Sequence, residues 1–415
     1  MTARSAQGFL RILYAVHGYK PAYRVGGPIL SVSAAAETLV RKGHHVIVFT
    51  TNSNLDEDLN APLDQPVMVD GVQVWYFRRE EPIQRWLPFV PYLSKSMGFL
   101  YAPKMATQLN QLVPGMDVVH THMPFVYPTY AAARAARRCR KPLFYHQRGV
   151  FDPERLKFRS LKKRLYIDIF ERPIMQRATT LLALTEAEVE SYRALGIRTP
   201  CRIVPNGIDT TAYRTRPSRD FDVSWGLPSD ALLILFLGRL HPIKGADRLL
   251  QAFLRLQARI PQAVLVMAGP DEWGLEAKFR ERIQAAGLGR QVFFPGMVSG
   301  NDKLDLLARA NLFCLPSDAE GFSMAVLEAL ASATPVLLSP GCHFPEIEAA
   351  GAGRVVSHEP EALAIALADL LADPGKLRAM GGRGREWVAQ HYSWDRITDQ
   401  LLDVYHEGLE RNKLA

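Results

Sequence analysis

Apolar stretches of strand length alternate with longer amphipathic stretches from the start of the chain. The apolar run at 11–19 predicts a strand, a Gly- and Pro-containing loop follows, and apolar positions then recur at helical spacing over 29–42. Gly43 ends this helix, and the apolar run at 44–50 predicts the next strand. A strand, a helix and a second strand in this order favour a parallel sheet with helices on both faces.

This alternation occurs twice along the chain. In the first half, further apolar runs predict strands at 72–77, 117–122, 142–147, 178–185 and 202–207. A polar, turn-rich stretch at 205–230 then predicts a linker between domains. In the second half, strands are predicted at 231–239, 263–270, 292–298, 311–317, 335–339 and 353–357. The fold class is therefore α/β, with two doubly wound, Rossmann-like domains expected to face each other across a cleft.

Composition narrows the class of protein. The chain has 415 residues, of which 48% are hydrophobic and 22% charged, as in ordinary globular proteins. No apolar run reaches the roughly 18 residues that span a bilayer. The four cysteines are widely spaced and form neither a metal-ligand pattern nor an obvious disulfide framework. We therefore expect a reduced, cytoplasmic protein.

The charge pattern leaves several partners open. The net charge of +8 is compatible with nucleic acid, an anionic membrane or phosphorylated substrates. Basic residues are concentrated over 155–177, which is either a solvated helix face or a contact with acidic headgroups. No RNA-binding signature of alternating basic and aromatic residues occurs, so no nucleic acid partner is expected.

A second segment, 85–104, combines aromatic and basic side chains. These aromatics either fill the core between helices or rest on the inner face of a membrane.

The stretch EGFSMAVLE at 320–328 carries the clearest candidate chemistry. Ser323 favours a helix N-cap, so a helix is predicted to begin at Met324 and to leave its first amides without intrahelical partners. Such a helix start suits a diphosphate, which Gly321 would let approach the backbone closely. Glu320 and Glu328 would flank that anion, as a sugar and a ribose flank the diphosphate of a nucleotide-sugar. A surface glutamate beside a capped helix remains the alternative.

The stretch GRLHPIKG at 238–245 adds two cations at a predicted strand end. Arg239 and Lys244 bracket a short loop before a helix, where they could neutralise a departing diphosphate. A basic loop alone is more often solvated than functional. Its occurrence with the two carboxylates in one α/β domain favours the functional interpretation.

Together these two motifs resemble the retaining family 4 glycosyltransferases, which have the GT-B fold. The similarity extends over nearly the whole chain and includes weaker motifs at 26–28, 117–124, 184–188, 204–209, 267–270 and 392–397, and the strand end at His146. The resemblance implies an acceptor-side domain over 1–205 and a nucleotide-sugar donor domain over 206–390. It also implies that a C-terminal helix over 391–415 packs back on the first domain.

The resemblance also implies roles for individual residues. Arg239 and Lys244 would clamp the donor diphosphate, Glu320 would bind the hydroxyls of the transferred sugar, and Glu328 would hold the ribose. The amides of Gly321, Phe322 and Ser323 would lie near the sugar and phosphate.

In the first domain, Gly26 and Gly27 would close over the phosphates, and His146 would lie beside the reacting centre. A strand-end histidine satisfied by backbone is the alternative for His146. His120 and His122, two positions apart, would share one face of a strand and are expected to be structural.

The implied activity is transfer of a hexose-type sugar, with retention and without a metal or other cofactor, to a glycan or lipid-linked glycan. No carboxylate nucleophile stands at a matching position, which favours front-face attack assisted by the leaving phosphate. Two alternatives stay open: a nucleotide-sugar epimerase or phosphorylase on the same architecture, and a non-catalytic protein that binds nucleotide-sugars.

Overall fold

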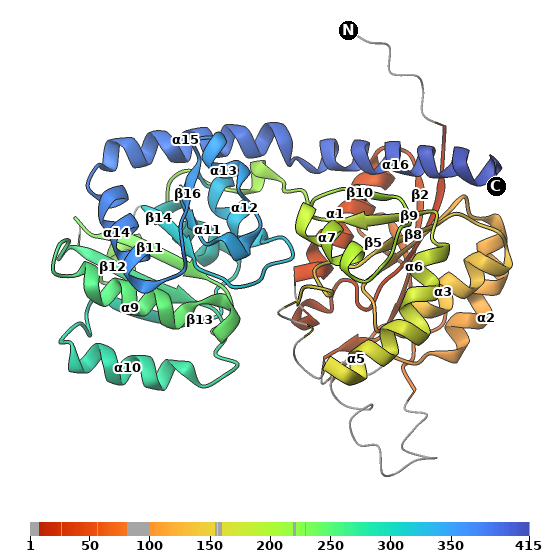
Figure 1. Ribbon diagram of the computed structural model, residues 1–415, viewed down its shortest axis with the longest axis horizontal. Helices are drawn as coiled ribbons and strands as arrows, with labels where there is room; N and C mark the ends of the chain where they lie inside the picture. The colour runs from red at the N-terminus through yellow and green to blue at the C-terminus, as the bar shows by residue number, and fades with distance from the viewer. Residues whose placement is uncertain are drawn as a thin grey trace, which may run out of the picture. The chain divides into compact units, whose positions relative to one another are not determined.

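The chain forms two compact units in a computed structural model. The first unit comprises Met1–Gly207 and Trp394–Ala415, and the second comprises Ile208–Ser393 (Figure 1). The structure describes residues 8–25, 27–55, 57–80, 100–153, 156, 160–218, 221–228 and 230–414.

The first unit is built on an eight-stranded sheet with the order β10-β9-β8-β7-β1-β2-β6-β5. Its strands are β1 (Arg11–Ala15), β2 (His45–Thr51), β5 (Pro66–Val69), β6 (Val72–Phe77), β7 (Val118–His122), β8 (Leu143–His146), β9 (Thr180–Ala183) and β10 (Cys201–Ile203). All neighbours pair in parallel except β5, which runs antiparallel to β6. A separate short hairpin joins β3 (Ser53–Asn54) and β4 (Glu57–Asp58). The expectation of a parallel sheet is therefore correct for every neighbouring pair but one.

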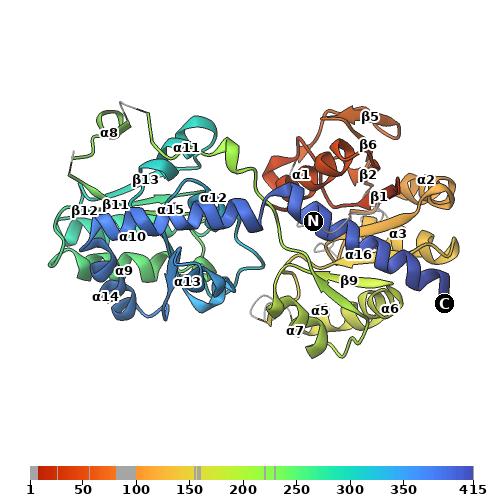
Figure 2. The same ribbon diagram turned by 90° about the horizontal axis from the view of Figure 1, so that it is seen from above.

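Helices cover the first sheet. They are α1 (Gly27–Arg41), α2 (Pro103–Leu112), α3 (Tyr127–Arg138), α5 (Ser160–Tyr166), α6 (Arg172–Arg177), α7 (Glu186–Ala194) and α16 (Trp394–Leu414), and the π-helical turn η3 (Ile167–Glu171) joins α5 to α6. The C-terminal helix α16 packs against α1 (Figure 2). Its apolar residues share one buried cluster with residues of β1, β2 and β6.

The second unit contains a six-stranded, fully parallel sheet with the order β13-β12-β11-β14-β15-β16. Its strands are β11 (Leu232–Leu237), β12 (Ala263–Ala268), β13 (Val292–Gly296), β14 (Leu312–Leu315), β15 (Val336–Leu338) and β16 (Gly353–Val355). Its helices are α8 (Phe221–Ser224), α9 (Ala246–Leu256), α10 (Leu275–Ala285), α11 (Gly300–Arg309), α12 (Met324–Ala331), α13 (Glu346–Ala349), α14 (Pro360–Leu371) and α15 (Pro374–His391).

The predicted linker at 205–230 contains the boundary between the two units, which lies at Gly207–Ile208, but part of its remaining length packs into the second unit. Ile208, Phe221 and Leu227 are buried in the hydrophobic core of the second unit. Ile208 also forms a β-bridge with Ser393, where the chain leaves that unit again. These buried apolar residues are separated by many polar ones, so they produce neither a helix nor a strand pattern in the sequence.

Candidate active site

The start of α12 lies at the carboxyl end of the second sheet. The chain leaves β14 at Leu315, turns, and begins α12 at Met324, with Ser323 at the N-cap in an extended conformation. The helix start is therefore where the sequence predicted it, but the Ser323 side chain accepts no capping hydrogen bond. By helix geometry the amides of the first turn have no intrahelical partners, so they can bind an anion.

An ion pair between Lys244 and Glu320 lies beside this helix start. The Lys244 Nζ is 2.5 Å from Glu320 Oε1, and these side chains are only 17% and 6% exposed. The Glu320 amide donates to the carbonyl of Gly341 at 2.8 Å, which fixes the loop that carries the carboxylate. The structure therefore brings together two residues that lie far apart in the sequence and that the two motifs singled out independently.

Lys244 is placed by a tightly built turn. It ends the 3₁₀ turn η5 (Pro242–Lys244), whose start is capped by His241, since His241 Nδ1 accepts from the Ile243 amide at 3.1 Å. Gly245 follows with φ of 72°, and a Cβ on it would lie 2.0 Å from the carbonyl oxygen of Pro316. Only glycine fits there, because the loop after β14 runs directly against this turn.

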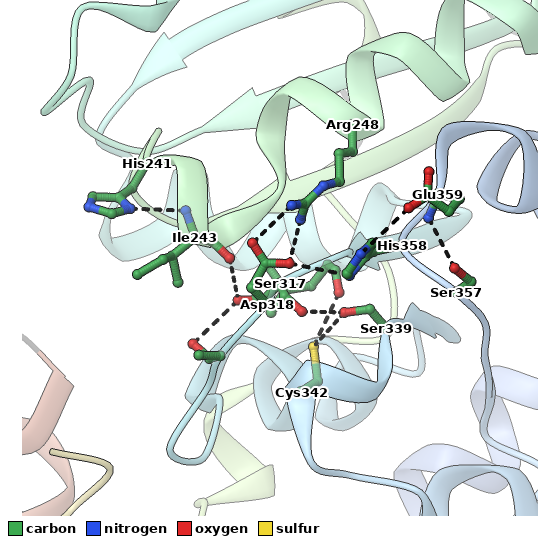
Figure 3. Close-up of polar contacts among 12 residues, drawn as sticks. His241, Ile243, Arg248, Ser317, Asp318, Ser339, Cys342, Ser357, His358 and Glu359 are labelled. Carbon is green, nitrogen blue, oxygen red and sulfur yellow. Dashed lines mark hydrogen bonds and ion pairs between the residues drawn. The ribbon is translucent and has the colours of Figure 1, made fainter. Parts of the chain in front are cut away.

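A polar cluster around Asp318 joins these two loops (Figure 3). The guanidinium of Arg248 donates to both carboxylate oxygens of Asp318, at 2.6 and 3.0 Å, and His358 Nδ1 is 3.2 Å from Asp318 Oδ1. The Asp318 amide and the Ser317 hydroxyl both donate to the carbonyl of Ile243, at 2.8 and 2.9 Å. This cluster was not predicted from the sequence. Its signals were the position of Asp318 two residues before Glu320 and that of Arg248 one helical turn after Lys244.

Arg239 is not part of the Lys244–Glu320 contact. It follows β11, and its Nη1 is 2.9 Å from Glu272 Oε2, with the Arg239 side chain 53% exposed. Gly269 approaches the same strand end closely, since a Cβ on it would lie 1.9 Å from the Gly238 carbonyl oxygen. The expected pair of cations thus divides into a partly buried lysine and an exposed arginine.

Glu328 lies inside α12 and is buried. Its Oε1 accepts from Lys303 Nζ at 2.9 Å and from the Tyr213 hydroxyl at 3.1 Å. Burial, together with the charge of Glu328, raises the pKa of Tyr213, so this phenol remains a hydrogen-bond donor. The Phe322 ring, in the loop before α12, packs against the ring of Phe344 with a centroid distance of 5.3 Å.

In the first unit, His146 ends β8 and is 3% exposed. Among the described residues neither of its ring nitrogens has a hydrogen-bond partner, so the interpretation of a histidine satisfied by backbone is wrong. Its ring lies beside those of His120 and His122, and one nitrogen of each of the three histidines lies within 4.8 Å of the others. Burial holds the pKa of all three well below the usual value, so they are neutral at physiological pH.

Arg148 contacts this histidine cluster through a hydrogen bond to His122. Its Nε donates to His122 Nδ1 at 3.0 Å, and its Nη1 donates to Ser31 Oγ and Asn206 Oδ1 at 3.2 and 3.0 Å. Burial lowers the pKa of Arg148 to about 10, which still leaves it charged. A guanidinium that hydrogen-bonds to one of the three histidines disfavours a bound cation. The cluster is better suited to hydroxyl or anionic groups.

Two of the predicted N-terminal features are only partly described. Gly27 begins α1, and apart from its chain neighbours and the backbone of its own helix no atom of the described residues lies within 4 Å of where its Cβ would be. Gly26 lies outside the described residues, as does most of the segment 85–104, of which only 100–104 are described. Among those, Tyr101 packs edge-on against Tyr127 at a centroid distance of 5.0 Å.

Comparison with known families matches both units. Residues 26–207 match the glycosyl transferase 4-like domain, and residues 218–387 match the glycosyl transferases of group 1. A D-inositol 3-phosphate glycosyltransferase of Saccharomonospora viridis is 28% identical over 397 residues, which cover 92% of this chain and 90% of that protein. An uncharacterized glycosyltransferase of Methanocaldococcus jannaschii is 25% identical over 93% of this chain and 95% of its own length.

Solved structures share the architecture. HepE of Anabaena in complex with UDP and glucose superposes with a TM-score of 0.72 at 20% identity, over 96% of this chain and all of that chain. Sucrose-phosphate synthase of Thermosynechococcus elongatus also superposes with a TM-score of 0.72, at 23% identity over 96% and 99% of the two chains. None of the helices in the described part of the chain is long and apolar enough to cross a bilayer.

Proposed function

Because the chain belongs to the GT-B glycosyltransferases, as its two C-terminal motifs predicted, we propose that it is a retaining hexosyltransferase. It would move a hexose from a nucleotide-diphosphate-sugar to a glycan or lipid-linked glycan. UDP-sugars are the first donors to test, because solved structures of similar fold are complexes with UDP and UDP-glucose. An inositol phosphate is an additional acceptor candidate, because it is part of the name of the relative from S. viridis.

The observation that carries this proposal is the Lys244–Glu320 pair beside the start of α12. A partly buried ammonium and a set of first-turn amides lie beyond the carboxyl ends of the neighbouring strands β11 and β14, which suits a diphosphate. Glu320, held by Lys244, offers its second oxygen to a sugar hydroxyl. Glu328 lies farther along the same helix and would accept from the ribose.

In the proposed reaction, the bond between the anomeric carbon and the diphosphate oxygen breaks, and the acceptor oxygen bonds to that carbon from the same face. The acceptor proton passes to the leaving phosphate oxygen, so no protein carboxylate need form a covalent intermediate. Lys244, Arg239 and the helix amides would stabilise the charge that develops on the diphosphate. His146, neutral and without a hydrogen-bond partner among the described residues, would bind a sugar or acceptor hydroxyl.

Lys244→Ala and Glu320→Ala test the proposal. We expect each to lower sugar transfer by about 100-fold or more, because one preorganised charge stabiliser is typically worth that much. Lys278→Ala, an exposed lysine of the same unit, is the matched control and should leave transfer unchanged. Near-normal transfer by both site variants would refute the proposal.

The nucleotide and the reaction type need their own measurement. In a thermal-shift panel of UDP, GDP, ADP and their sugars, the true donor should raise the melting temperature of the wild type, since it binds only the folded state. Product analysis then separates the alternatives. An altered sugar without acceptor would indicate an epimerase, dependence on inorganic phosphate a phosphorylase, and binding without turnover a non-catalytic protein.

A further inference from the structure

A row of apolar side chains faces solvent along the helical stretch from α5 through η3. Leu161, Leu165 and Ile169 follow one another at intervals of four residues and are 80%, 61% and 55% exposed. The opposite side of the stretch supplies the packing contacts, since Ile167 is buried and the ring of Tyr166 lies 5.3 Å from that of Phe125. The exposed row is therefore not needed for the core of the unit.

A basic groove continues from this row. It has a volume of about 410 Å³ and lies between α3 and the η3–α6 stretch, with Ile169 and Phe170 among its apolar lining residues. The cations that line it are Arg134, Arg137, Lys141 and Arg177. Within the described part of the chain, none of these four forms an ion pair with a carboxylate. Apolar and uncompensated cationic side chains thus share one surface.

We propose that this basic–apolar face, formed by the exposed row and the groove cations, docks the protein on a bilayer that contains anionic lipids. Exposed leucine and isoleucine side chains insert at the headgroup boundary, while arginine and lysine contact the lipid phosphates. A nucleic acid would match the cations and leave the apolar row exposed to water. A protein partner would need a surface that is both acidic and apolar at matching positions. An anionic bilayer has negatively charged headgroups above an apolar interior over its whole surface.

This inference deepens the proposed function, since a protein docked in this way would meet a lipid-linked acceptor at the membrane. It favours headgroup contact for the basic segment 155–177, which contains the exposed row and Arg177. Its test measures membrane binding, so it can fail without affecting the assignment of sugar transfer.

Flotation of the full-length protein with vesicles tests the proposal. We expect the wild type to float with vesicles of phosphatidylcholine mixed with phosphatidylglycerol, and to stay behind with pure phosphatidylcholine. Arg134→Ala combined with Arg137→Ala should weaken binding about 30-fold, from about fivefold for each cation. Leu165→Ser combined with Ile169→Ser should weaken it about tenfold or more, since each apolar side chain loses its burial.

Matched variants control for charge and apolar area elsewhere. Arg290→Ala with Arg378→Ala removes two exposed charges, and Met68→Ser removes an exposed apolar side chain; both should float like the wild type. The thermal shift with the donor nucleotide should be unchanged in every variant, which shows that the fold and the donor site are intact.

Two results would overturn the inference. One is equal binding to both kinds of vesicle, or none to either. The other is binding that depends on the arginines while the Leu165 and Ile169 variant behaves like the wild type, which would indicate a general polyanion site. Normal flotation by a protein that binds no nucleotide would instead overturn the proposed function alone.

Discussion

Glu171 is a carboxylate buried inside the first unit. It is 2% exposed and accepts hydrogen bonds from the Phe125 amide and the Tyr145 hydroxyl, each at 2.7 Å. Burial penalises its charged form more than these two donors stabilise it, and its pKa rises from 4.5 to about 7. The folded protein therefore holds this proton more tightly than the unfolded chain does.

This shift predicts a pH dependence that Glu171→Gln should remove. Because the pKa is higher in the folded state, the contribution of Glu171 to the free energy of unfolding is full below pH 4.5. It falls as the pH rises towards about 7 and is lost above that. The loss amounts to about 3 kcal/mol, at about 1.4 kcal/mol for each pKa unit.

The stability of Glu171→Gln relative to the wild type should therefore increase from about pH 5 to about pH 8, measured by denaturant unfolding at each pH. The buried histidines have the opposite dependence, but they are present in both proteins and cancel in the difference. A difference that does not change with pH would contradict the prediction.

Individual site residues were predictable only where a motif contained them. Lys244, Glu320 and Glu328 lie in two short motifs, and the structure places Lys244 against Glu320. Asp318 escaped notice because its partners Arg248 and His358 lie in distant segments, and pairwise contacts of that kind leave no periodic signal. The unpartnered state of His146 likewise depends on what surrounds it in three dimensions.

At the scale of secondary-structure elements, buried parallel strands were the easiest to predict. Strands such as β11 and β12 are covered on both faces, so they appear as continuous apolar runs. The missed strand β5 is a four-residue edge strand that starts with Pro66 and alternates between exposed and partly exposed positions. An edge strand of this kind has no apolar run to identify it.

The loop that joins β14 to α12 depends on the close approach of a second loop. A Cβ on Gly341 would lie 2.3 Å from the carbonyl oxygen of Asp318 and 2.4 Å from that of Ser317, and Gly341 itself accepts from the Glu320 amide. Both neighbouring atoms belong to backbone, so a methyl group can be accommodated only if one loop moves.

Gly341→Ala should therefore displace Glu320. We expect a loss of stability of about 1–3 kcal/mol, as for other overpacked sites, together with loss of the nucleotide-induced thermal shift. Gly289→Ala is the control, since this glycine is exposed and no atom lies within 4 Å of where its Cβ would be. Nucleotide binding by Gly341→Ala that equals that of the control would show that the contact between the loops is not needed for donor binding.

At the scale of the whole molecule, the chain passes between the two units twice, at 207–208 and at 393–394. The second passage returns α16 to the first unit, where Ile397, Leu401, Leu402 and Tyr405 are buried. The Tyr405 hydroxyl is also 2.7 Å from His120 Nδ1, so the last helix supports the histidine cluster directly. The second unit, by contrast, is one uninterrupted segment with its own core.

This connectivity predicts unequal effects of cutting the chain at the second passage. Deleting 394–415 removes four large apolar side chains from the first unit, each worth about 1.5–3 kcal/mol, which approaches the entire stability of a typical domain. Calorimetry should show that the unfolding transition of the first unit is lost or has a much lower melting temperature.

The fragment 208–393 keeps Lys244, Glu320, Glu328 and the whole of the second core, so it should fold alone and retain a nucleotide-dependent thermal shift. A fragment that folds cooperatively but shows no shift with any nucleotide would mean that the first unit supplies essential donor contacts. A fragment that does not fold would mean that the core of the second unit is insufficient without its partner.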